Sequence, residues 1–103
     1  MNKSVTNALR VFECLVSGEF AEKTALEVCE ATSIPFTTCW RLLKTMHAQG
    51  WVVETTVPGG KQGRWKVSRR LVEIAEAYEA AAVRRVQTIR NEYHSITGKE
   101  LKA

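Results

Sequence analysis

Apolar residues recur at helical spacing most clearly within residues 34–49, where they predict a helix with one buried face. The inner stripe of this helix consists of Cys39, Leu42, Leu43 and Met46. Pro35 suits the entrance of such a helix because its missing N–H costs nothing there, and Gly50 suits a left-handed cap. We therefore expect a helix over Phe36–Gln49 that presents its other side outward.

Two shorter apolar faces precede this helix. The first predicts a helix over Val5–Ser17, with Ser4 as its N-cap and Gly18 as its end, followed by a loop around Glu19–Lys23. Its expected apolar face consists of Val5, Ala8, Leu9, Phe12, Leu15 and Val16.

The second of these faces follows a T-x-x-E capping box made by Thr24 and Glu27. It predicts a short helix over Ala25–Thr32, with inner candidates Ala25, Leu26, Val28 and Cys29. A tight turn at residues 33–35 comes next, and its apolar Ile34 is expected to fill the angle between two helices. Two helices joined by so short a turn predict a helix-turn-helix.

β-forming residues then replace the helical pattern. Trp51–Val57 and Arg64–Val67 predict two strands, and the glycine-rich residues 58–63 between them predict a hairpin tip. Trp51 and Trp65 are expected in the hairpin core. A hairpin placed directly after such a helix is a wing.

The last predicted element is a helix over Arg69–Thr97, capped by Ser68 and ended by Gly98. Its apolar positions alternate spacings of four and three, with one doubled four at Ala82–Val86, which is the pattern of a coiled-coil seam with a stutter. The seam consists of Leu71, Ala75, Tyr78, Ala82, Val86, Ile89 and Tyr93, with Ile96 beyond it. It can pack on the first helix or on a second copy. We favour a second copy for the distal half, because a three-helix domain cannot cover so long a helix.

Together these elements predict a mostly α fold with a small β-hairpin, namely a winged helix-turn-helix followed by a long C-terminal helix. The expected division is a winged domain at residues 1–67 and a linker or dimerisation helix at residues 68–103.

Composition narrows the classes of function. The chain has 103 residues and no apolar run long enough to cross a bilayer, so we expect a cytoplasmic protein with no membrane partner. Its three cysteines form no C-x-x-C pair, and His47 and His94 lack ligand spacing with them, so we expect buried thiols and neither metal nor cofactor. There is no Asp and no catalytic arrangement, so an enzyme is not expected.

Charge is concentrated in one third of the chain. Residues 36–70 carry seven Lys or Arg and a single acid, Glu54, although the net charge of the whole chain is only +4. Cations beside hydroxyls on one helix and its wing favour a polyanion partner, because each cation near a phosphate releases counterions. The alternative is a solvated basic surface.

The outer residues of the basic segment are therefore candidates for contact with double-stranded DNA in the major groove. Thr37 and Thr38 can donate to phosphate or base edges, although Thr37 can also simply cap the helix. Trp40 can meet the DNA or pack against the wing. The full candidate set is Phe36, Thr37, Thr38, Trp40, Arg41, Lys44, Thr45, Lys61 and Arg64. Of these, Lys44, Thr45, Lys61 and Arg64 are expected to meet the backbone.

Several of these motifs resemble the DNA-binding domain of the IclR family of bacterial transcription regulators. The resemblance is carried by residues 5–11, by Ile34-Pro35 with Thr37-Thr38 and residues 41–46, by Gly50-Trp51-Val52, by residues 65–67, and by Arg70-Leu71 and Ala77-Tyr78. It implies a winged helix-turn-helix, a dimer built through the first and linker helices, and short palindromic operators. Thr37 stands where the family usually has Ser, and Phe36 where it often has a basic residue, which puts one phosphate contact in doubt.

The resemblance ends where that family's effector domain begins, so we expect no small-molecule site in this chain, whether the domain was removed or never existed. The leading hypothesis is a sequence-specific transcription regulator, acting as a dimer in bacteria or phages. Two alternatives stay open at this point: a winged helix that binds proteins, and a non-specific architectural DNA binder.

Overall fold

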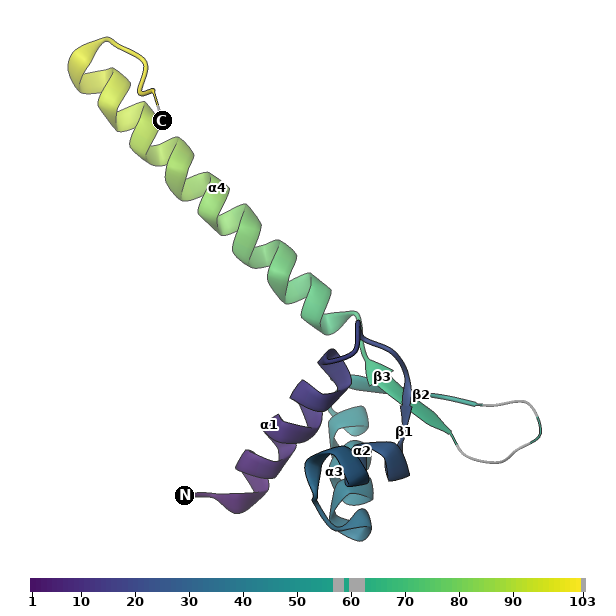
Figure 1. Ribbon diagram of the computed structural model, residues 1–103. Helices are drawn as coiled ribbons and strands as arrows, with labels where there is room; N and C mark the ends of the chain where they lie inside the picture. The colour runs from purple at the N-terminus through teal and green to yellow at the C-terminus, as the bar shows by residue number, and fades with distance from the viewer. Residues whose placement is uncertain (57–58, 60–62, 103) are drawn as a thin grey trace. The chain divides into compact units, whose positions relative to one another are not determined.

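The computed structural model describes residues 1–56, 59 and 63–102, and these residues form four helices and a three-stranded antiparallel sheet (Figure 1). The chain divides into two compact units, Met1–Leu71 and Val72–Ala103, which are described separately below. The mostly α winged fold expected from the sequence is confirmed.

Helix α1 spans Lys3–Val16 and begins two residues before the predicted start. The prediction of Ser4 as N-cap was wrong: the Asn2 side chain caps the helix by accepting from the Val5 amide at 3.1 Å. The predicted inner face was wrong in part as well. Val5 and Leu9 are 55% and 60% exposed, whereas Leu15 is buried as predicted. Val11 and Cys14, which were not assigned to this face, are buried as well. The three buried residues of α1 therefore all lie in its second half.

Helix α2 spans Ala25–Thr32, as predicted, and both hydrogen bonds of its capping box are present. Its inner residues Ala25 and Val28 are buried and Cys29 is partly buried, but Leu26 is 46% exposed and was wrongly assigned to the inner side. The turn that follows places Ser33 in the left-handed region and buries Ile34, which confirms its role between two helices.

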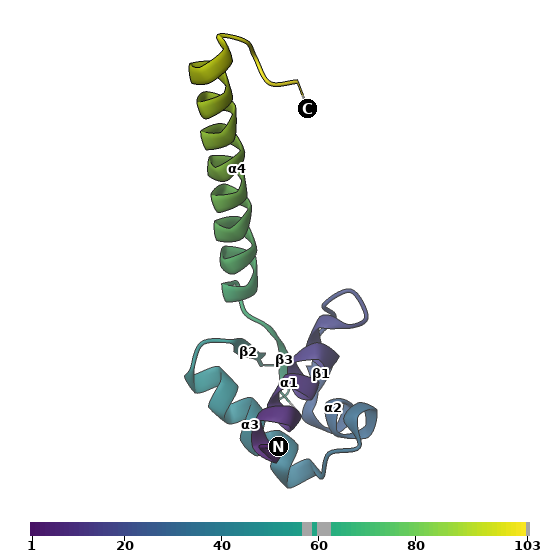
Figure 2. The ribbon, with the colours of Figure 1, turned by 90° about the vertical axis from the view of Figure 1, so that its left-hand side faces the viewer.

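Helix α3 spans Phe36–Ala48, which is one residue shorter than expected, and Gln49 is its C-cap. Its inner stripe is confirmed, because Cys39 and Leu43 are fully buried and Leu42 and Met46 are partly buried. Gly50 has a φ of 83°, so a left-handed residue does follow the helix. In Figure 2, α2 and α3 are joined by the short turn of a helix-turn-helix.

The sheet contains one strand that the sequence did not predict. Strands β2 (Val52–Thr55) and β3 (Arg64–Val67) form the wing, and β1 (Lys23–Thr24) pairs with β3 on its other edge. Strand β2 is shorter than the predicted Trp51–Val57: Trp51 precedes it, and Val57 lies outside the described residues. β1 falls in the segment that was expected to be a loop.

One core holds the first unit together. It combines residues from all three short helices with one from the turn before α3 and one from each wing strand. The core consists of Val11, Cys14, Leu15, Ala25, Val28, Ile34, Cys39, Leu43, Val52 and Trp65. Trp51 adds an edge contact to Phe12, with ring centroids 6.1 Å apart. Trp65 is buried and Trp51 partly buried, as expected of the hairpin core. The core fixes the wing against α3.

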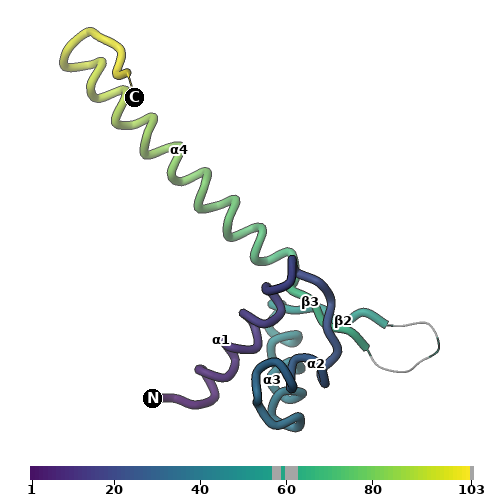
Figure 3. The backbone as a smooth tube through the Cα atoms, viewed as in Figure 1, coloured from purple at the N-terminus to yellow at the C-terminus, as the bar shows by residue number. Residues whose placement is uncertain are grey.

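Helix α4 spans Arg70–Thr97 and runs without interruption in the backbone trace (Figure 3). Its length corresponds to about 42 Å at 1.5 Å per residue. The Ser68 hydroxyl accepts from the Arg70 amide at 3.2 Å, and Gly98 follows the helix with a positive φ, so both predicted ends are confirmed within one residue. None of the residues Arg70–Thr97 is buried in a single copy of the chain.

Candidate nucleic-acid interface

The outer side of α3 divides into two surfaces once its inner stripe is fixed in the core. One surface faces outward and carries Thr37, Arg41 and Thr45, all exposed. The other turns toward the wing and carries Phe36, Trp40 and Lys44. Thr38 is half-buried at the edge of the core. The predicted α3 candidates therefore lie on one element but do not form a single cluster.

The outward surface begins at a helix end that the protein leaves uncompensated. The N-cap of α3 is Pro35, and within the described part of the chain no side chain caps this helix and no acid lies in its first turn. Thr37 therefore does not act as the cap, which was the alternative weighed for it. The free amides and the positive end of the helix dipole are suited to an anion such as a phosphate.

The wing-facing surface forms a groove, which we call the aromatic groove. It has a volume of about 360 Å³ and is lined by Ala25, Leu26, Phe36, Trp40, Lys44, Glu54, Gly63 and Trp65. Phe36 and Trp40 are 47% and 44% exposed, whereas Trp65 forms the buried floor. Leu26 is exposed because it lines this groove. Trp40 lines the groove beside the wing and is also accessible to a ligand, so it combines the two positions considered for it.

Lys44 crosses this groove instead of extending freely into solvent. Its ammonium lies 5.1 Å from the centre of the Trp40 ring and 5.7 Å from that of Trp65. The Glu54 carboxylate lies 3.7 Å from the same ammonium. The Lys44 ammonium thus has two aromatic faces and one carboxylate as attractive partners, each of modest strength at a half-exposed site.

Glu54 also explains the glycine that precedes β3. A Cβ atom placed on Gly63 would collide with the Glu54 carboxylate and would lie 2.9 Å from its Cγ. The Glu54 side chain would therefore have to move if residue 63 carried a side chain. Sequence reasoning noted Glu54 only as the single acid of the basic segment. Its cross-strand register with Trp65, which brings it to the groove, could be found from the pairing of the predicted strands.

Two of the residues predicted to contact DNA, Lys61 and Arg64, fall on the wing segment of the sequence. Arg64 is exposed at the beginning of β3, and its carbonyl accepts from the Thr55 hydroxyl at 3.3 Å. Lys61 lies outside the described residues. Lys66, which was not predicted, lies on β3 with its ammonium 4.0 Å from the Glu22 carboxylate.

The three cysteines lie in the core or packed against it. Cys14 and Cys39 are buried and Cys29 is partly buried, all as free thiols, and burial raises the pKa of the Cys39 thiol to about 11. Cys39 is therefore a neutral core residue near pH 7. Among the described residues, no group of three His, Cys or Glu side chains is placed to hold a metal ion. Within the same residues, no helix has the length and apolar character needed to cross a membrane.

Comparison with known proteins agrees with this geometry. The family model of the IclR helix-turn-helix domain matches residues 4–55, which is just over half of the chain and includes α1, α2, α3 and β2. No curated protein sequence matches the chain.

Solved structures show the same fold at low sequence identity. The Zalpha domain of PKZ from Carassius auratus, solved in complex with Z-DNA, is 14% identical with a TM-score of 0.56, and the match covers 64% of this chain and 98% of that domain. Two mutant forms of MepR from S. aureus, the second from a multidrug resistant clinical isolate, are 11% and 10% identical with TM-scores of 0.57. Each match covers 89% of this chain, which spans 66% and 64% of the two MepR chains.

Proposed function

The chain belongs to the IclR helix-turn-helix family, a class of DNA-binding transcription regulators, and from this premise we propose that it binds double-stranded DNA sequence-specifically. The observation that carries the proposal is the outward surface of α3. This surface combines an uncapped helix start with Thr37, Arg41 and Thr45. The opposite side of the same helix is buried in the core. Such a helix can enter the major groove without disturbing the fold.

Each candidate residue then has a distinct role. Arg41 lies one turn into α3, where a guanidinium can reach the O6 and N7 acceptors of guanine. Thr37 and Thr38 donate to the phosphate that meets the start of the helix, and Phe36 and Trp40 offer apolar faces to sugar or to a thymine methyl group. Lys44, Thr45, Lys61 and Arg64 hold the protein on the backbone.

We further propose that the chain acts as a dimer, with residues 1–67 as the DNA-binding part and residues 68–103 as the linker and dimerisation helix. The seam residues of α4 support this, because Tyr78, Val86 and Ile89 are 70%, 49% and 56% exposed in one copy. Val5 and Leu9 leave a second apolar stripe on α1. A two-fold dimer would present its recognition helices to half-sites about one DNA turn, or roughly 34 Å, or a multiple of this apart.

Titration of the chain with duplex DNA at several salt concentrations tests the proposal. We expect the logarithm of the association constant to fall linearly with the logarithm of salt concentration, because phosphate contacts release counterions. We also expect a selected duplex to bind at least about 10³-fold more tightly than random DNA. Affinity that does not change with salt would contradict DNA binding, and equal affinity for all duplexes would contradict specificity.

A further inference from the structure

The aromatic groove contains an ammonium group that belongs to the protein itself. The Lys44 nitrogen lies 5.1 Å from the centre of the Trp40 ring, 5.7 Å from that of Trp65 and 3.7 Å from a carboxylate oxygen of Glu54. Aromatic faces around a cation are the means by which proteins recognise alkylated ammonium ligands, and a carboxylate adds the opposite charge. The Lys44 head group therefore marks a position at which this groove attracts a cation.

Three elements bring these groups around one space. Phe36, Trp40 and Lys44 follow one another at intervals of four residues along α3, so their side chains form a row on one side of the helix. Glu54 on β2 lies opposite Trp65 on β3, so the carboxylate and the buried indole share one face of the wing. The groove between this row and the wing is therefore lined by three rings and one acid.

Lys44 is bound weakly enough for another cation to replace it. The side chains of Lys44 and Glu54 are 46% and 36% exposed, so water screens their ion pair, and holding the long lysine side chain in one conformation costs entropy. A primary ammonium group is also strongly hydrated. A quaternary ammonium group gives up less bound water on entering the groove, and its methyl groups can contact the ring faces.

We propose that the aromatic groove is a binding site for a small organic cation with an alkylated ammonium head group, which takes the place of the Lys44 ammonium. The groove volume of about 360 Å³ lies within the range of small-molecule sites. Phe36, which is 47% exposed, is the third ring that such a head group can contact. Once Lys44 is displaced, the unneutralised Glu54 carboxylate attracts cations and repels phosphate. The site goes beyond the proposed DNA binding and does not rest on it.

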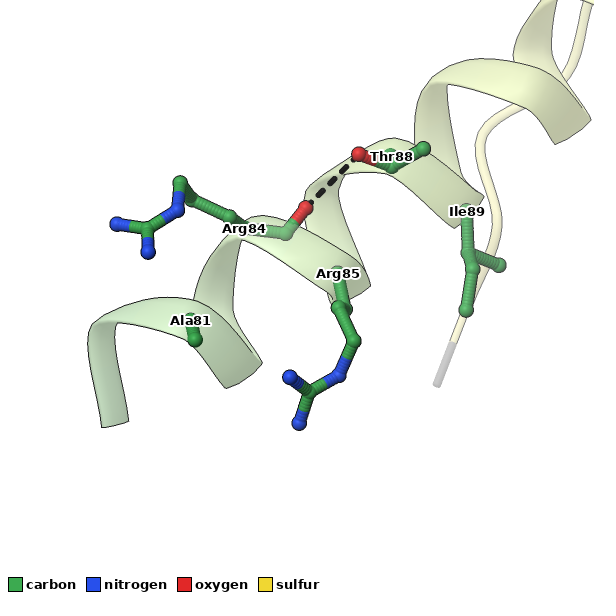
Figure 4. Close-up of a pocket in the computed structure, with 5 residues that line it drawn as sticks. All are labelled: Ala81, Arg84, Arg85, Thr88 and Ile89. Atoms are coloured by element: carbon green, nitrogen blue, oxygen red, sulfur yellow. Dashed lines mark hydrogen bonds between the residues drawn. The ribbon is translucent and has the colours of Figure 1, made fainter. Parts of the chain in front are cut away.

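A groove on α4 shows that volume alone does not make such a site. Its volume is about 470 Å³, but none of its lining residues, Ala81, Arg84, Arg85, Thr88 and Ile89, is aromatic or acidic. Figure 4 shows the two arginine side chains leaving the helix in different directions, with the Thr88 hydroxyl donating to the Arg84 carbonyl. The arginines make this groove positive, so an organic cation finds no attractive partner among its lining residues.

Replacement of Lys44 by glutamine should open the site to a ligand. Choline serves as the probe, and NMR of the tryptophan indole N–H groups follows its binding to the full chain, with sodium chloride at the same concentration as the blank. We expect the Trp40 and Trp65 signals to shift and the signal of Trp51, which packs on Phe12, to stay. Lys44→Gln should bind choline about five- to tenfold more tightly than the wild-type chain, because the internal competitor is gone.

Lys66 provides a matched control on the wing. Its ammonium lies 4.0 Å from the Glu22 carboxylate, and the two side chains are 45% and 38% exposed, nearly as in the pair of Lys44 and Glu54. Neither Lys66 nor Glu22 lines the groove. Lys66→Gln should therefore leave the affinity for choline at the wild-type value. An increase equal to that of Lys44→Gln would reveal a general effect of charge and overturn the proposal.

Two further measurements separate recognition of a cation from simple apolar binding. The uncharged isostere in which carbon replaces the choline nitrogen should bind Lys44→Gln at least about tenfold more weakly than choline does. Adding Trp40→Leu to Lys44→Gln keeps an apolar lining but removes one ring face, and should lower the affinity for choline at least about fivefold, with circular dichroism to confirm the fold.

Equal binding of choline and its uncharged isostere would overturn the proposal. So would the absence of any shift of the Trp40 and Trp65 signals when Lys44→Gln is titrated with choline. These titrations contain no DNA, so their failure is distinguishable from a failure of DNA binding.

Discussion

The winged unit and helix α4 use their apolar residues in opposite ways. In Met1–Leu71, apolar residues from three helices and two strands converge on one core in which Leu15, Leu43 and Trp65 are almost entirely inaccessible to solvent. In α4 the same kinds of residue form a regular row with none buried in a single copy, Arg70–Thr97 being fully described. The difference shows that the first unit has the core of an independent fold, whereas α4 buries none of its apolar row in a single copy.

The largest expected effect comes from removing a core side chain of α3. Leu43→Ala should lower the free energy of unfolding by about 2–5 kcal/mol, because the transfer free energy is lost and a cavity remains. Ile74→Ala, which truncates a side chain that is 48% exposed on α4, should change it by less than about 0.5 kcal/mol. Urea unfolding followed by tryptophan fluorescence measures both, since all three tryptophans lie in the first unit. Equal losses would contradict the contrast between the units.

A smaller effect is expected where the outward surface of α3 meets DNA. Arg41→Ala should weaken binding to a selected duplex by about 1–3 kcal/mol and relax the preference at one base pair, without altering stability. Arg84→Ala removes the same charge from α4 and serves as the control in the same duplex titrations. An equal loss on selected and random duplexes would show that Arg41 meets phosphate and not a base.

Replacing Glu54, the acid of the aromatic groove, should strengthen DNA binding instead of weakening it. Glu54→Gln releases Lys44 from its ion pair, so affinity for every duplex should rise by about two- to fivefold, in line with the modest strength of exposed pairs. Glu13→Gln, an exposed acid on α1, controls for the general loss of negative charge. Weaker binding of the Glu54 variant to a selected duplex alone would show instead that the carboxylate reads a base.

The smallest effect concerns the pH dependence of folding. The pKa of Glu27 is lowered from its ordinary value of 4.5, mainly because its carboxylate accepts hydrogen bonds from the Thr24 amide and hydroxyl, with smaller help from Arg64 and Lys23. A lowered pKa means that the stabilisation is complete above about pH 4.5 and is lost as the pH falls through the folded-state value.

Glu27→Gln should therefore flatten the loss of stability between about pH 5 and pH 3, measured by urea unfolding at each pH. Glu30→Gln, an exposed acid on the same helix, should retain the wild-type slope. An unchanged slope in the Glu27 variant would remove the capping box as the source of this pH dependence.

Local signals account for the parts of the fold that were predicted correctly. The capping box at Thr24 and Glu27, the apolar Ile34 in a tight turn, and the inner stripe through Cys39 and Leu43 each depend on neighbours within a few positions. Such interactions can be recognised in the sequence directly, and the structure contains all three.

The features that sequence reasoning missed depend on distant residues. Lys23 and Thr24 become a strand only because Trp65 and Arg64 offer a free edge of β3. Val5 and Leu9 in the first half of α1 are exposed, although they continue its apolar spacing. Likewise, the contact of Lys44 with Glu54 arises only once the wing folds against α3.

Selection of bound fragments from a pool of random duplexes tests the central claim most directly. The account predicts enrichment of a short inverted repeat whose half-sites lie about one helical turn or a multiple of it apart, and loss of a guanine-containing position when Arg41→Ala replaces the wild-type chain. Enrichment of no motif, despite salt-dependent binding, would contradict sequence-specific recognition and identify the protein as a non-specific DNA binder.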